Sequence, residues 1–196
     1  TKAVNDQNES PFVRINAIKG IKNLKKEQSA DDIGNALKDP DPGIRAAACD
    51  ALPAVNGVSY ARTLVPMLQP NADTPEVQDK AWDALQAFLP SLDNADLQAF
   101  ADQFGEKLPK YRARCLTQIR DNCMKAGDVN GLALALQNLG STLMNPEIAD
   151  YESAAAQFDN AISTLLVCGT KPASARMVPL YRDRLRATLR SGKYAD

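Results

Sequence analysis

Carboxylates are the first side chains of this sequence that could do chemistry, because two of them close together can act as an acid and a base or bind a hard cation. Four stand near the starts of expected helices, namely Asp31, Asp32, Asp39 and Asp41. Aspartate at such positions ordinarily caps a helix and complements its dipole. The sequence has neither the spacing of a calcium loop nor a glycine-rich phosphate loop. We therefore interpret the four residues as caps and predict no metal and no cofactor.

The sequence contains no histidine and four cysteines. The absence of histidine excludes Ser-His-Asp triads, Cys₂His₂ zinc sites, and catalytic zinc or haem held by histidine. The cysteines form no CxxC pair, so nothing indicates a zinc or thioredoxin-type motif. We predict free and mostly buried thiols, and no catalytic residue, for Cys49, Cys115, Cys123 and Cys168.

Basic side chains gather in the C-terminal part of a chain whose formal net charge is −1. Residues 1–109 carry 11 basic and 16 acidic side chains, whereas residues 110–196 carry 12 basic and 8 acidic ones. In the helix expected at residues 173–190, Arg182, Arg186 and Arg190 run beside an apolar stripe formed by Val178, Tyr181, Leu185 and Leu189. This row of arginines is a solvated face, or a contact for an acidic protein such as a second copy's N-terminal half, or a contact for nucleic acid or anionic lipid.

The elements that must position these side chains follow from an internal repeat. Residues 11–21, 42–52, 75–85 and, more weakly, 109–119 begin with Pro, carry Arg or Gln at +3, and place apolar side chains at +2, +6, +7 and +10. Those four positions share one helical face. Proline suits a first helical turn, and Ser10, Asp41 and Thr74 precede it as N-cap residues in the first three copies. Each copy therefore predicts an amphipathic helix, with Trp82 in a core position.

A second apolar pattern follows each of the first three copies, at residues 31–37, 59–68 and 96–104. Two antiparallel helices per 31–34 residues, repeated in tandem, predict an all-α fold, an α-solenoid built as a right-handed superhelix of helix pairs. Second helices usually line the concave side of such folds. We therefore expect Tyr60 and Met67 to be surface contacts for a partner.

Residues 39–52 resemble the short HEAT-repeat motif D-P-D-P-x-V-R-x-A-A-A-x-A-L, and the resemblance covers residues 10–126. It implies that the arginines at +3, which are Arg14, Arg45 and Arg112, bond neighbouring turns or an aspartate of the adjacent repeat. A row of ligand-binding arginines is the alternative, which Gln78 in the third copy weakens.

The C-terminal third is similar to a tetratricopeptide unit, with Leu136, Leu139, Gly140 and Leu143 on one helix and Ala154, Phe158 and Ala161 on the next. Leucines stand where that family has aromatic residues, and a HEAT-like interpretation of the same helices stays open. We predict a flexible segment at residues 1–9, HEAT-like repeats at 10–126, a TPR-like hairpin at 127–170, and a capping helix with a tail at 171–196.

These patterns favour a non-catalytic scaffold, adaptor or accessory subunit that binds a protein partner of unknown identity. An enzyme similar to the bilin lyases with HEAT repeats and a nucleic-acid-binding HEAT-like module are the alternatives, and the acidic charge of the repeats disfavours nucleic acid. Self-association through the acidic and basic halves stays open. No membrane span is predicted. Free cysteines favour the cytoplasm, and a processed or exported form remains an alternative.

Overall fold

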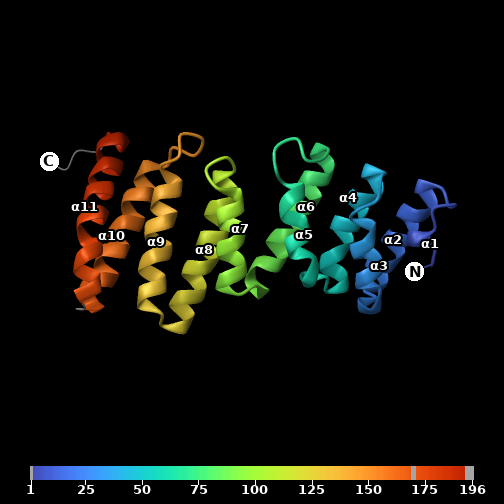
Figure 1. Cartoon of the computed structure of the whole chain (residues 1–196), viewed down its shortest axis with the longest axis horizontal. Helices are drawn as coiled ribbons and strands as arrows, with labels where there is room; N and C mark the ends of the chain where they lie inside the picture. Colours follow the sequence, from blue (N-terminus) through green and yellow to red (C-terminus); the bar gives the residue numbers. More distant parts are fainter. Residues whose placement is uncertain (1, 169–170, 193–196) are drawn as a thin grey trace. The chain divides into compact units, whose positions relative to one another are not determined.

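The computed structural model describes residues 2–168 and 171–192, and every regular element within them is helical. The chain divides into two compact units, Thr1–Leu92 and Asp93–Asp196. Within each unit, neighbouring helices pack against one another (Figure 1). The prediction of an all-α solenoid-type fold is confirmed at this level.

The first unit contains six α-helices joined by short 3₁₀ turns. They are α1 (Lys2–Asn5), α2 (Pro11–Leu24), α3 (Ala30–Ala36), α4 (Pro42–Ala51), α5 (Ala61–Met67) and α6 (Pro75–Phe88). The 3₁₀ turns are η1 (Glu27–Ser29), η2 (Leu52–Val55), η3 (Val58–Tyr60) and η4 (Leu89–Ser91). The proline-started helices form one layer, because α4 packs against both α2 and α6.

The starts of these helices are set by the predicted caps. The side chains of Ser10, Asp41 and Thr74 each accept a hydrogen bond from a backbone N–H three residues later, and a proline opens each helix. The cap satisfies one of the donors that a helix start leaves without a partner. Pro66 lies in the last turn of α5, which ends one residue later at Met67.

The repeat positions +2, +6, +7 and +10 are all fully buried in the second copy, with Ile44, Ala48 and Cys49 on α4 and Leu52 at the start of η2. The first copy differs, because Val13 at +2 is 40% exposed. Trp82 is only partly buried, so its position is less interior than the sequence predicted.

The segment at residues 1–9, predicted to be flexible, instead contains helix α1. Val4 is fully buried, and its carbonyl accepts a hydrogen bond from Arg14 Nε at 2.8 Å. The sequence prediction missed this helix because four residues are too few to show a helical period.

The second unit contains α7 (Asn94–Phe104), α8 (Pro109–Ala126), α9 (Val129–Leu143), α10 (Tyr151–Cys168) and α11 (Lys171–Ser191). Each of these helices packs against the next. Helix α7 begins two residues before the predicted start and is capped by Asp93, whereas Leu108 gives α8 no side-chain cap. The predicted final helix is therefore present and packs against α10.

One core cluster of this unit lies between α9, α10 and α11. Its buried members include Leu136, Phe158, Leu165, Leu180 and Ala187. Gly140 permits close contact between α9 and α10, because a Cβ there would lie 2.9 Å from the ring of Phe158. The helices of the TPR-like hairpin thus pack where the pattern places their buried residues, while membership of that family stays a prediction.

Candidate functional site

The arginine at +3 of the first repeat is buried and forms an ion pair inside the first unit. Arg14 is 4% exposed and forms an ion pair with Asp39, which is 7% exposed. Its Nε also donates to the Val4 carbonyl at 2.8 Å. A buried guanidinium that is paired in this way ties α2 to the segment before α4 and to α1.

The arginine at +3 of the second repeat also pairs with an aspartate. Arg45 binds Asp73 through two hydrogen bonds, Nε to Oδ2 at 2.8 Å and NH2 to Oδ1 at 2.6 Å. Its NH1 donates to the carbonyls of Asp39 and Pro40. The hydrogen bond from Arg45 lowers the pKa of Asp73 below its ordinary value. The structural interpretation of these arginines is therefore confirmed for Arg14 and Arg45.

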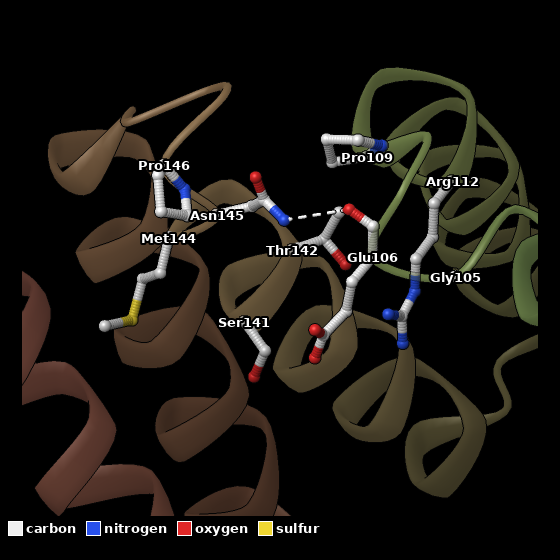
Figure 2. Close-up of a pocket in the computed structure, with 9 residues that line it drawn as sticks. All are labelled: Gly105, Glu106, Pro109, Arg112, Ser141, Thr142, Met144, Asn145 and Pro146. Atoms are coloured by element: carbon white, nitrogen blue, oxygen red, sulfur yellow. Dashed lines mark hydrogen bonds between the residues drawn. The ribbon is translucent and has the colours of Figure 1, made fainter. Parts of the chain in front are cut away.

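The third arginine of the series, Arg112, lies in the second unit and lines a pocket of about 320 Å³. Figure 2 shows its guanidinium and the Glu106 carboxylate on one side of this pocket, with Ser141 and Asn145 opposite. The Asn145 amide donates to the Glu106 carbonyl at 3.1 Å. The buried Nε of Arg112 has no hydrogen-bond partner among the described residues. One acid and one base face this pocket, which leaves it without a dominant charge.

The four clustered aspartates divide into different roles, so their interpretation as caps is only partly right. Asp41 caps α4. Asp39 binds Arg14, Asp31 accepts a hydrogen bond from the Tyr60 hydroxyl, and Asp32 accepts one from the Asn5 amide. Among the described residues, no group of three or more side chains is placed to hold a metal ion.

Tyr60 holds α3 in place within the first unit. Its hydroxyl donates to Asp31 Oδ1 at 2.7 Å, and this bond raises the pKa of Tyr60. Its ring lies against Gly34, where a Cβ would come within 2.1 Å of the ring carbons. Met67 is half-buried at the end of α5. A role of either residue in binding a partner stays a prediction.

The arginine row on α11 is exposed, as Arg182, Arg186 and Arg190 all lie at the surface. Arg182 and Arg186 share the carboxylate of Asp183, at 3.3 and 3.4 Å. The guanidinium of Arg190 lies over the ring of Tyr151, 5.8 Å from its centroid. Exposed ion pairs of this kind contribute little stability, so these side chains remain available to a partner.

The apolar stripe of α11 does not pack against the unit. Val178 is 75% exposed, Leu185 56%, Tyr181 50% and Leu189 49%. The side chains of α11 that are fully buried against α10 are Leu180 and Ala187. At about 100° per residue, these two project from nearly the opposite side of the helix. The expected capping helix thus covers α10 with one face and presents a second apolar face to solvent.

The cysteines of the described part of the chain are poor nucleophiles. Burial raises the pKa of Cys49 and of Cys115 to about 12 and also raises the pKa of Cys123. All three are free thiols, as predicted, and the side chain of Cys168 lies outside the described residues. A thiol with a raised pKa carries little thiolate at neutral pH, and the thiolate is the reactive form.

The first unit is similar to a known protein family. Residues 2–86 match the family model for HEAT repeats. The chain contains HEAT repeats. No curated protein and no solved structure matches it. Within the described residues, no helix combines the length and the apolar character that a membrane crossing requires.

The HEAT match begins at residue 2, so it includes α1, and it ends within α6. The HEAT-like boundary predicted at residue 126 stays a prediction.

The sequence did not single out Asp39 and Asp73 as the partners of Arg14 and Arg45. A usable signal was present, because each aspartate follows its arginine by 25 or 28 residues and stands just before the next repeat.

Arg45 and Arg112, which share the +3 position of the sequence repeat, provide a matched pair for a stability test. We expect Arg45→Met to lower the free energy of unfolding by about 2–3 kcal/mol, because it leaves the largely buried Asp73 without its main donor. Arg112→Met should cost less than about 1 kcal/mol, because no carboxylate depends on Arg112. Urea unfolding followed by circular dichroism measures both, with each transition fitted separately.

The pH dependence checks that this loss comes from the ion pair. Because the pKa of Asp73 is lowered in the folded chain, its contribution is present above its unfolded pKa and is lost as the pH falls through the folded value. The difference between Arg45→Met and the native chain should therefore shrink in acid. Equal losses for Arg45→Met and Arg112→Met at neutral pH would contradict the assignment.

A second test concerns the packing of Tyr60 against Gly34. Gly34→Ala should destabilise the native chain by about 1–3 kcal/mol, because the new methyl group collides with the Tyr60 ring. In a Tyr60→Ala background the same change should be neutral or stabilising by up to about 1 kcal/mol, because alanine favours the helix. An identical effect of Gly34→Ala in both backgrounds, measured by thermal unfolding, would show that the ring does not lie there.

Proposed function

We propose that this chain is a non-catalytic binding platform, a scaffold, adaptor or accessory subunit of a larger assembly, that binds another protein through the outward face of α11. HEAT repeats generally mediate protein–protein interaction, and the match over residues 2–86 supports a protein partner in general. One observation carries the finer proposal, namely the stripe of four apolar side chains on α11 that are 49–75% exposed.

An exposed stripe of this kind has a free-energy consequence. Burial stabilises a large apolar side chain by about 1.5–3 kcal/mol when it moves from full exposure to full burial. The four stripe residues of α11 are 49–75% exposed, so a large part of that change is still available to them. Contiguous apolar surface rimmed by charge is typical of contact sites. This surface therefore supports protein binding as the use of α11.

The alternatives receive no support from the described residues. A bilin-lyase-like activity requires a groove for a tetrapyrrole, and the larger recess of about 540 Å³ is lined mainly by polar side chains such as Arg120, Asp121 and Asn160. Recognition of single-stranded nucleic acid uses base-stacking aromatic residues beside basic ones, and Tyr181 is the one aromatic side chain in the exposed stripe. We propose neither function.

The test is affinity capture from native, nuclease-treated lysate with the intact chain and two variants. Tyr181→Ser/Leu185→Ser removes the centre of the stripe, and Phe12→Ser/Leu24→Ser removes exposed apolar side chains of the first unit. We expect a stoichiometric protein partner that persists at about 0.3 M salt, where exposed charges are strongly screened, and that the first variant alone loses. Circular dichroism first establishes that both variants are folded.

Two results would contradict the proposal. One is the absence of any stoichiometric partner of the intact chain. The other is equal loss, or equal retention, of the partner by the two variants, since the binding face would then lie elsewhere.

A further inference from the structure

The exposed stripe of α11 carries an asymmetric charge along one flank. Arg182 and Arg186 each follow a stripe residue directly and are four residues apart, so they lie one above the other on the same side of the helix. The described side chains of α11 include five arginines and a single acidic residue, Asp183. The flank is therefore positive, although one carboxylate is close by.

Asp183 does not neutralise this flank. Both guanidinium groups share its carboxylate, and the contacts of 3.3 and 3.4 Å are long for ion pairs. The Asp183 side chain is 18% exposed, whereas those of Arg182 and Arg186 are each 59% exposed. Two exposed positive groups and one recessed negative group leave a net charge of about +1 beside the stripe, directed toward solvent.

From this arrangement we infer that the partner contributes an acidic amphipathic helix, which docks along α11 with its apolar face on the stripe and its carboxylates at Arg182 and Arg186. This inference rests on the proposed function and names the chemistry of the partner. Apolar residues at i, i+3, i+4 and i+7 of such a helix match the spacings of Val178, Tyr181, Leu185 and Leu189. An extended peptide is disfavoured, because a helix offers no unpaired backbone groups to a strand.

A second copy of the chain fits this face less well. If two copies of α11 met antiparallel about a twofold axis, the same surface of each would be apposed, and the arginine flanks would lie on the same side of the seam. Like charges across a contact are unfavourable, and two Asp183 side chains cannot balance four exposed guanidinium groups. An acidic partner helix replaces this repulsion by attraction.

The experiment measures binding of two synthetic helices to the full chain by fluorescence anisotropy. Each dye-labelled probe has about 20 residues with leucines on one face, because shorter isolated helices are marginal in water. One probe carries glutamates beside the leucines, and the other carries lysines at the same positions. We expect the acidic probe to bind at least about 10-fold more tightly at about 50 mM salt, with the preference shrinking as added salt screens the charges.

Charge-swapped variants locate the effect. Arg182→Glu/Arg186→Glu should reverse the preference between the two probes. The matched control Arg114→Glu/Arg176→Glu has the same net charge but changes exposed arginines away from the stripe, and it should keep the preference for the acidic probe. Tyr181→Ser/Leu185→Ser should weaken the binding of both probes.

Several outcomes would overturn the inference. Equal affinity for both probes, or an equal effect of the two charge-swapped pairs, would remove the role of Arg182 and Arg186. Sedimentation velocity that shows a dimer of the intact chain, lost in Tyr181→Ser/Leu185→Ser, would identify a second copy as the occupant. A chain that binds neither probe yet retains a captured protein through the stripe would leave the proposed function standing while the acidic helix fails.

Discussion

Amphipathic helices in a stack must be covered on each apolar face, and this constraint explains most of the structure. In the first unit α4 meets it, because it packs against α2 and α6 and its repeat positions are fully buried. In the second unit α10 is covered on both sides, because it packs against α9 and α11. Helix α11 is covered on one side only, since Leu180 and Ala187 are buried while the four apolar residues of the stripe are exposed. The function proposed here follows from that second, uncovered face.

Charged side chains have different roles in the two units. In the first unit, Arg14 and Arg45 bind Asp39 and Asp73 inside the repeats, where the pairs position successive helices and are removed from solvent. A buried charge of this kind costs free energy when its partner is lost, so each pair disfavours packings that would separate it. On α11 the arginines lie at the surface, where they add little stability and can attract an acidic partner.

The sequence predicted the features that depend on local rules. The helix starts at Ser10, Asp41 and Thr74 followed from capping chemistry, and the core of α4 followed from the 3.6-residue period. The orientation of α11 did not follow, because a period shows which residues share a face but not which face is covered. Both Leu180 with Ala187 and Val178 with Leu185 have helical spacing. The choice between them is made by contacts with α10, which lie beyond the reach of local patterns.

The rate of thiol labelling on the isolated chain shows whether α11 has an uncovered apolar face. In a Cys168→Ala background, the remaining native thiols are buried. Single cysteines are then introduced as Leu185→Cys in the stripe and as Ala187→Cys in the buried face, and each is labelled with a thiol reagent. Because Leu185 is exposed and Ala187 is fully buried, we expect fast labelling of Leu185→Cys, near the rate of an unfolded chain, and slow labelling of Ala187→Cys. Equally slow labelling of both positions would show that the stripe is already covered and that α11 has no free apolar face.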